Sequence, residues 1–257
     1  VADRFDLRRS IQFDTRIVGA KFEDESNRWH LETQSGASVT ARYVIAATGC
    51  LSTGNTPDFP GLDDFAGSCY HTGTWPHDGV DFTGKRVGLI GTGSTGIQAT
   101  PVIAEQADHL YVFQRTPNYS IPARNEPLTK KESAEIKRRY AEIRERCRAS
   151  DGGFPFAPSE RMAQDYSAAE RDEIYEELWQ LGGFRILLCS FAELTIDEFT
   201  NETVAEFIRK KIREMVNDPK VAEQLLPYDH PYGTKRPPID TDYYKTFNRD
   251  NVTLVDV

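Results

Sequence analysis

A glycine-rich turn at residues 91–96 has the residue types and the spacing that hold a pyrophosphate. It follows the short apolar run Val87–Ile90 and opens a helical pattern that extends to about residue 107. Gly91 permits the tight turn, Gly93 lets the backbone approach a pyrophosphate, and Gly96 allows close packing of helix on strand. The helix N-terminus adds free N–H groups and the positive end of its dipole. The pattern predicts a dinucleotide site, against the alternative of a glycine-rich turn without a ligand.

The strand after this helix ends in a cation. In dinucleotide-binding units the residue about 20 positions after the glycines reads the ribose, and an acidic side chain there favours NAD. Here Arg115 stands 19 residues after Gly96, and Thr116 follows it. A guanidinium and a hydroxyl suit a 2′-phosphate, so the predicted cofactor is NADPH. The alternative is an ordinary solvated arginine at a strand end.

The composition excludes several other classes of protein. The 257 residues carry 31 Lys and Arg against 40 Asp and Glu, a net charge of −9. Nucleic-acid binding needs a clustered positive face, which this scattered charge does not predict. No apolar run approaches the roughly 18 residues that a membrane span requires. The four cysteines, at 50, 69, 147 and 189, lack metal-ligand spacing, so we expect no metal site and a cytoplasmic setting.

The elements before the glycine loop read as an antiparallel meander that follows a helix tail at residues 1–9. Its predicted strands are Ile11–Phe13, Trp29–Thr33 and Val39–Tyr43, separated by turn residues. The run Tyr43–Ala47 is nearly all apolar, which predicts a strand buried on both faces that ends at residues 48 and 49.

The segment from 122 to 230 is mostly helical by pattern. Lys130–Arg148 reads as one charged amphipathic helix. A second helix shows one apolar face, and Thr203 and Glu206 are spaced as its capping box. That face consists of Val204, Phe207, Ile208, Ile212 and Met215. A rigid, basic stretch at 232–238 then leads to a final strand in the last residues of the sequence.

The long connection at 52–85 contains a specific motif, FxGxxxHxxxWP. Its residues are Phe65, Gly67, His71, Trp75 and Pro76. This motif closely resembles the fingerprint of type I Baeyer–Villiger monooxygenases, which are FAD- and NADPH-dependent enzymes that insert oxygen beside a carbonyl. Without the resemblance, His71 and Trp75 would be interpreted as a packed pair within the loop.

The resemblance covers essentially the whole chain and implies an α/β fold. In that fold a Rossmann-type NADPH-binding domain with a helical insertion is preceded by a β-meander and the last strand of an FAD-binding domain. The implied segments are a remnant of the FAD-binding domain (1–51), a linker with the fingerprint (52–85), the NADPH-binding unit (86–121), the helical insertion (122–230) and a return segment (231–257).

The resemblance also implies roles for individual residues. The NADPH loop would comprise Gly91, Thr92, Gly93, Ser94, Thr95 and Gly96. Arg115, Thr116 and Lys235 would hold the 2′-phosphate, and Arg236 would be the catalytic arginine. Thr48 and Gly49 would form a hinge, and Cys50 and Leu51 would lie near the flavin and the substrate. For Cys50 the alternative is a small buried residue.

One departure from the family pattern is that the sequence has a single GxGxxG, at 91–96. The family carries an earlier glycine loop for FAD, so the remainder of the FAD domain is expected to be missing and the chain alone to be inactive. The parent enzyme would use O2 to convert a ketone to an ester or lactone. The alternatives are a flavin monooxygenase that oxidises nitrogen or sulfur, an NADP-binding or sensor module without catalysis, and, with less support, a simple NADPH dehydrogenase.

Overall fold

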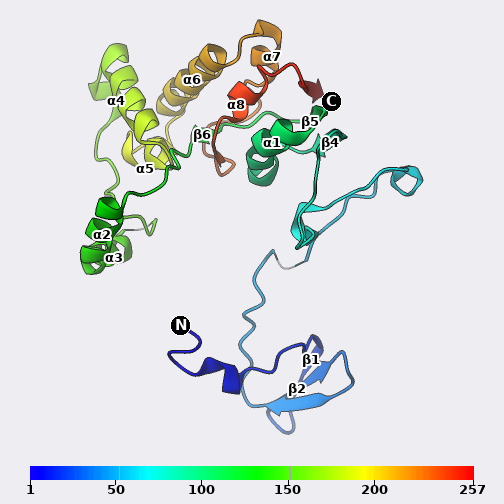
Figure 1. Ribbon diagram of the computed structural model, residues 1–257. Coiled ribbons are helices and arrows are strands. Elements are labelled where there is room, and N and C mark those ends of the chain that lie inside the picture. The colour runs from blue at the N-terminus through cyan, green and yellow to red at the C-terminus, as the bar shows by residue number, and fades with distance from the viewer. Residues whose placement is uncertain (52, 151) are drawn as a thin grey trace. The chain divides into compact units, whose positions relative to one another are not determined.

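The computed structural model describes residues 1–51, 53–150 and 152–257 (Figure 1). Ser52, where the predicted connection begins, lies outside the described residues. The chain divides into two units, Val1–Trp75 and Pro76–Val257. The finer division into five segments stays a prediction.

The first unit contains the predicted antiparallel meander. Its strands are β1 (Ile17–Glu23), β2 (Arg28–Thr33) and β3 (Ser38–Ala41), with β2 in the middle. Trp29 of β2 lies opposite Phe22, and their ring centroids are 5.4 Å apart. Asn27 and Gly36 have positive φ angles of 53° and 84° in the two turns, as tight reversals require.

Three predictions for this unit are wrong. Residues 11–13 form no strand, because the first strand of the meander begins at residue 17. The predicted helix tail is a single 3₁₀ turn, η1 (Leu7–Ser10). Residues 43–47 form no strand, and Tyr43 and Ile45 are 81% and 90% exposed. An apolar strand needs neighbouring strands on its edges, and the described residues pair none with this run.

The connection to the second unit has little regular structure. Between residue 53 and the strand that begins at 86, the structure has two short 3₁₀ turns, η2 (Leu62–Asp64) and η3 (Thr72–Thr74). An isolated bridge pairs Thr83 with Ala107 inside the second unit.

The second unit is built on a parallel sheet, which confirms the predicted β-turn-α-β unit and the final strand. The strands β4 (Arg86–Ile90), β5 (His109–Gln114) and β8 (Val252–Asp256) lie in the order β4-β5-β8, and α1 (Ser94–Gln106) connects the first two (Figure 1). Every second residue of β5 is buried. The apolar residues Ile97, Ile103 and Ala104 of α1 are buried in the same core.

The helices between β5 and β8 surround a second part of this core. Their bounds are α2 (Lys130–Arg138), α3 (Tyr140–Ala149), η4 (Ala163–Asp165), α4 (Ala168–Leu181), α5 (Arg185–Cys189), α6 (Glu198–Met215), α7 (Pro219–Gln224) and α8 (Tyr243–Thr246). The predicted apolar face of α6 is confirmed, since Val204, Phe207, Ile208 and Ile212 are buried and Met215 packs against them.

Two helix predictions are corrected by the structure. The helix expected over 130–148 is broken at Arg139 into α2 and α3. Neither helix buries a residue, so no packing surface holds them in one straight rod. The helix α6 begins at residue 198, where Asp197 accepts a hydrogen bond from the backbone N–H of Thr200 at 2.8 Å. Thr203 therefore lies inside the helix and does not cap it.

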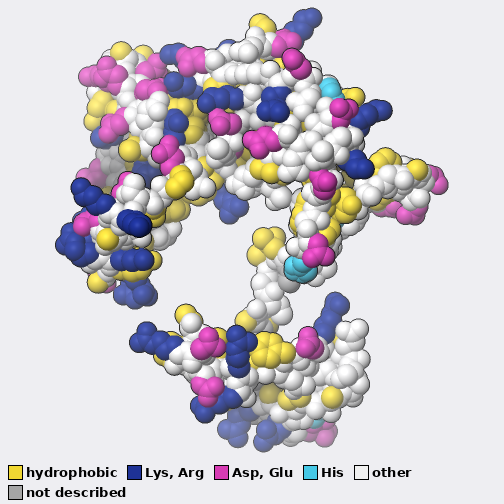
Figure 2. Space-filling view, viewed as in Figure 1, with side chains coloured by type: hydrophobic (Ala, Val, Ile, Leu, Met, Phe, Trp, Pro, Cys, Tyr) yellow, Lys and Arg dark blue, Asp and Glu magenta, His cyan; other side chains and the backbone are white. Residues whose placement is uncertain are grey.

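The Lys and Arg side chains of α2 and α3 gather on one part of the surface (Figure 2). Glutamates are interleaved with them, and Glu142 forms ion pairs with both Arg139 (2.9 Å) and Arg146 (2.5 Å). These exposed pairs contribute little to stability. No helix among the described residues is long and apolar enough to cross a membrane.

A short parallel ladder joins the start of the helical segment to its end. Strand β6 (Ile121–Pro122) pairs with β7 (Ile239–Asp240). The backbone N–H of Ile121 donates to the carbonyl of Pro238 at 3.0 Å, and that of Ala123 donates to the carbonyl of Asp240 at 2.7 Å. The return segment thus lies against the residues that leave the Rossmann unit.

Substitution of Gly96 by alanine should destabilise the fold. A Cβ atom at this position would lie 2.1 Å from the carbonyl oxygen of Gly91, so the helix or the turn must shift. We expect the free energy of unfolding to fall by about 1–3 kcal/mol, the usual cost of overpacking. Denaturant unfolding of the intact protein measures this change. Gly84→Ala is an unsuitable control because Gly84 has a φ of 66°. The control is Gly93→Ala, where the added methyl group meets no atom within 4 Å, and equal losses in both variants would contradict the steric explanation.

Candidate dinucleotide-binding site

The glycine loop between β4 and α1 has the geometry that a pyrophosphate requires. Gly91 has a φ of 106°, and its N–H donates to the carbonyl of Phe113 at 3.1 Å. Gly96 lies against the carbonyl of Gly91, while the space beside Gly93 is open. No side chain caps the N-terminus of α1. An anion can therefore approach the backbone of the loop and the free N–H groups at the start of α1, as the spacing predicts.

The loop is tied to the strand end that carries Arg115. Thr92 Oγ1 donates to the carbonyl oxygen of Thr116 at 2.7 Å. Arg115 is exposed, and within the described ranges its guanidinium has no ion-pair partner. The preceding residue, Gln114, is fully buried and donates through Nε2 to the carbonyl of Gln224 at 2.7 Å. A fixed backbone thus presents a cation next to the glycine loop.

The return segment lies on the same helix α1. Gln98 Nε2 donates to the carbonyl of Ile239 at 2.8 Å. Lys235 and Arg236 precede this anchor and are both exposed. Lys235 Nζ lies 3.8 Å from Asp229 Oδ2, and no ion pair involves Arg236 in the described part of the chain. Hydrogen bonds therefore connect the glycine loop to the strand end and the helix α1 to the return segment, whereas none joins Lys235 or Arg236 to Arg115 among the described residues.

A buried polar network supports this arrangement, and the sequence analysis missed it. Ser120 Oγ donates a short hydrogen bond to Asp240 Oδ2, and Asp240 Oδ1 accepts from the backbone N–H of Tyr243 at 2.8 Å. Tyr244 Oη donates to the carbonyl of Asn118 at 2.9 Å. Burial raises the pKa of Asp240, and the hydrogen bond from Ser120 opposes that shift. Ser120 and Asp240, like Asn118 and Tyr244, are more than 100 residues apart in the chain, so spacing gives no signal for these pairs.

The fingerprint residues in the first unit make local contacts within a largely exposed loop. His71 Nδ1 accepts a hydrogen bond from the backbone N–H of Gly73 at 3.0 Å, so the ring caps the turn η3. A Cβ atom on Gly67 would lie 2.6 Å from the ring of Phe65. The rings of Tyr70 and Trp75 have centroids 5.9 Å apart. These contacts are local, and Phe65 and Trp75 remain 62% and 39% exposed. The fingerprint's Pro76 begins the second unit.

The predicted hinge region is extended and exposed. Gly49 has a φ of 70°, which favours glycine, and it follows Thr48. Cys50 is exposed and Leu51 is 91% exposed. The alternative that Cys50 is a small buried residue is therefore wrong for this chain.

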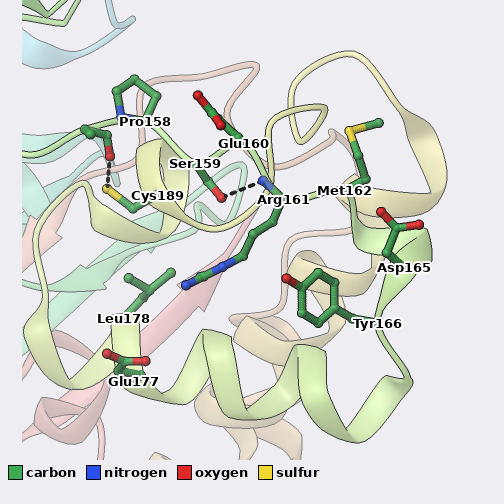
Figure 3. A pocket seen from close by; sticks show the side chains of 11 residues that line it. Pro158, Ser159, Glu160, Arg161, Met162, Asp165, Tyr166, Glu177, Leu178 and Cys189 are labelled. Atoms are coloured by element: carbon green, nitrogen blue, oxygen red, sulfur yellow. Dashed lines mark hydrogen bonds between the residues drawn. The ribbon is translucent and has the colours of Figure 1, made fainter.

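A cavity of about 640 Å³ lies elsewhere, between residues 157–166 and the helices α4 and α5 (Figure 3). Its lining carries three acidic side chains and one cation, Arg161, whose backbone N–H donates to Ser159 Oγ at 3.1 Å. Cys189 also lines it and donates to the carbonyl of Ala157 at 3.4 Å. None of the predicted site residues lines this cavity.

Comparison with known proteins shows which enzymes this chain is similar to. The profile of the flavin-binding monooxygenase-like family matches residues 1–126. The chain is 44% identical over its whole length to a Baeyer–Villiger monooxygenase from Pseudooceanicola batsensis, of which it covers 47%. The resemblance of this chain to the Baeyer–Villiger enzymes among the flavin-binding monooxygenases is confirmed.

Two further similarities bear on function. The chain is 40% identical to a phenazine N-monooxygenase from Lysobacter antibioticus, with 99% of this chain and 47% of the relative covered. A solved complex of OTEMO with FAD and NADP matches with a TM-score of 0.96 and 45% identity, over 99% of this chain and 49% of the other. The chain spans about half the length of the relatives it matches.

Substitution of Gly93 by alanine should weaken NADPH binding without loss of stability. The methyl group enters the open space that the pyrophosphate backbone contact requires. We expect the dissociation constant for NADPH to rise about tenfold or more. Titration by NADPH fluorescence measures it, and a thermal melt checks the fold. Val102→Ala on the exposed side of α1 is the control, and unchanged affinity in Gly93→Ala would show that the loop does not hold the pyrophosphate.

Proposed function

We propose that the whole protein is an FAD- and NADPH-dependent Baeyer–Villiger monooxygenase. It inserts one oxygen atom of O2 next to a ketone carbonyl and yields an ester or a lactone, and this chain supplies its NADPH site. The observation that carries the NADPH assignment is the 2.7 Å hydrogen bond from Thr92 to the carbonyl of Thr116, which fixes Arg115 beside an uncapped glycine loop.

The residues of the second unit fit NADPH. The backbone at Gly91–Gly96, including Thr92, Ser94 and Thr95, receives the pyrophosphate through free N–H groups. Arg115 and Thr116 contact the 2′-phosphate from the strand end, and Lys235 contacts it from the return segment. Arginine suits this task because its guanidinium is always charged and forms paired hydrogen bonds to phosphate oxygens.

The sequence contains no second glycine loop that could bind FAD. The single GxGxxG is the one proposed for NADPH. Thr48 and Gly49 are proposed as the hinge toward the FAD domain, and Cys50 and Leu51 as residues near flavin and substrate. The identity to an FAD- and NADP-bound homologue supports both cofactors in the whole protein. A cytoplasmic location is supported by the four unpaired cysteines.

Arg236 is proposed as the catalytic cation. Bound FAD and NADPH supply the redox chemistry. Attack on a ketone carbonyl places negative charge on its oxygen, and a permanent positive charge held nearby stabilises that charge as it develops. Arg236 is exposed, and among the described residues no carboxylate forms an ion pair with it. Its charge is thus available to the reaction.

Oxidation of an aromatic nitrogen is the second candidate function. The 40% identity to a phenazine N-monooxygenase supports it. The fingerprint from Phe65 to Pro76, with its Trp-Pro ending, favours the Baeyer–Villiger reaction. Parallel assays of the intact protein with cyclic ketones and with phenazines separate the two, because only one substrate class should give stoichiometric oxygenated product.

Arg236→Ala in the intact enzyme should abolish ester formation. Loss of a preorganised charged donor typically lowers the rate by about 100-fold or more. Gas chromatography of the ester measures the effect, alongside NADPH consumption. Arg144→Ala, another exposed arginine, is the matched control. A normal ester yield from Arg236→Ala would remove this residue from the mechanism.

Arg115→Ala should discriminate between the two nicotinamide cofactors. The KM for NADPH is expected to rise by roughly 10-fold or more, since a hydrogen bond to a charged group is worth about 1.5–3 kcal/mol. The KM for NADH should change little because NADH lacks the 2′-phosphate. Steady-state kinetics with both cofactors give the answer, and equal effects on both would show that Arg115 does not read the phosphate.

A further inference from the structure

The loop that carries Lys235 and Arg236 is held at both ends. On its C-terminal side, Pro238 and Ile239 are bonded to β6 and to Gln98 of α1. On its N-terminal side, Tyr232 is 1% exposed and is bonded to α6. Five residues, 233–237, lie between these anchors. So short a loop leaves the two cations little freedom once both ends are fixed.

The N-terminal anchor is a side-chain amide. Asn201 of α6 accepts a hydrogen bond through Oδ1 from the backbone N–H of Tyr232 at 2.9 Å. Its Nδ2 donates to the carbonyl of Tyr232 at 2.8 Å and to the carbonyl of Leu194 at 3.0 Å. One buried amide thus satisfies both backbone groups of Tyr232. Gly233 follows with a φ of 87°, so the chain turns immediately after the anchor toward Lys235.

A second set of hydrogen bonds holds Pro227, which precedes this anchor in the chain. The hydroxyl of Tyr119 donates to the carbonyl of Pro227 at 3.0 Å, and the same carbonyl accepts from Arg209 Nε at 2.9 Å. Arg209 is 4% exposed and also donates to the Tyr119 hydroxyl at 3.1 Å. Tyr119 stands three residues after Thr116, so this contact links the segment that follows β5 and the helix α6 to Pro227, which precedes the return segment.

We propose that Asn201 is a positioning residue that sets the place of Lys235 and Arg236 relative to the glycine loop. The helical insertion then has a task beyond packing, because α6 fixes one end of the cationic loop while the Rossmann unit fixes the other. This inference rests on the proposed function only for what the two cations do. The anchoring itself follows from the hydrogen bonds of Asn201.

The test uses Asn201→Ala in the intact enzyme. Loss of the amide frees the N-terminal side of the loop, so both cations should be misplaced together. We expect the KM for NADPH to rise about fivefold, the KM for NADH to rise less, and the fraction of oxidised NADPH that yields oxygenated product to fall about tenfold, in line with the cost of small displacements at a reacting centre. Hydrogen exchange of the Tyr232 amide should become at least about tenfold faster.

Thr203→Val is the matched control on the same helix. Thr203 Oγ1 pairs with the Tyr175 hydroxyl at 2.7 Å, and neither residue contacts the return segment by a hydrogen bond among the described residues. This variant loses a hydrogen bond between α4 and α6. A merely structural role for Asn201 predicts that both variants change cofactor selectivity and coupling equally, which would overturn the proposal.

Tyr119→Phe keeps the test decisive if Asn201→Ala fails to fold. It removes only the hydroxyl that bonds the Pro227 carbonyl, while Arg209 remains bonded to that carbonyl. We expect the KM for NADPH to rise and the fraction of oxidised NADPH that yields oxygenated product to fall. The logarithm of each change should be about half of that in Asn201→Ala. Unchanged selectivity and coupling in a folded variant that exchanges the Tyr232 amide faster would overturn the positioning role.

Failure of the proposed function gives a different result. If Lys235→Ala and Arg115→Ala leave NADPH kinetics unchanged, these cations do not read the 2′-phosphate. Faster exchange at Tyr232 in Asn201→Ala, with normal exchange in Thr203→Val, would still support the anchor. Normal exchange in Asn201→Ala would remove the anchor whatever the cations do.

Discussion

The parallel pairing of β5 with both β4 and β8 is the constraint on which the second unit depends. β5 is central, and its neighbours come from residues 86–90 and 252–256. The chain must therefore leave the sheet after residue 114 and return beside the same strand. Burial of Leu110 and Val112 of β5 in the hydrophobic core stabilises this return. The two ends of the helical segment lie side by side, because β6 at its start pairs with β7 after its end.

The pairing of β6 with β7 explains where the cationic side chains of the second unit lie. The chain is acidic overall, yet Arg115, Lys235 and Arg236 are exposed on segments that α1 and its glycine loop hold through Thr92 and Gln98. The backbone carbonyl of Thr116 accepts the hydrogen bond from Thr92, and that of Ile239 accepts the hydrogen bond from Gln98. The segments that carry the cations are therefore held through the main chain, and among the described residues the guanidinium groups of Arg115 and Arg236 form no ion pair, whereas Lys235 lies 3.8 Å from Asp229.

In the first unit, by contrast, an apolar segment lacks neighbouring strands among the described residues. Its meander is satisfied by its own hydrogen bonds, but the apolar run at 43–47 has no strand beside it in the described residues. The same sequence that predicts a buried strand is therefore exposed here. The chain spans about half the length of its homologues.

The sequence alone determined the features that depend on neighbouring residues. The glycine loop, the β-turn-α-β unit, the meander and the apolar face of α6 follow from local spacing, and the fingerprint was sufficient to indicate the family. Local spacing was wrong where a long-range contact or its absence decides the outcome, as in the run at 43–47 and the break at Arg139. Only the tertiary structure revealed the amide anchor of Asn201 and the pairing of Ser120 with Asp240, because each joins groups far apart in the chain whose burial, and not their spacing, makes their hydrogen bonds necessary.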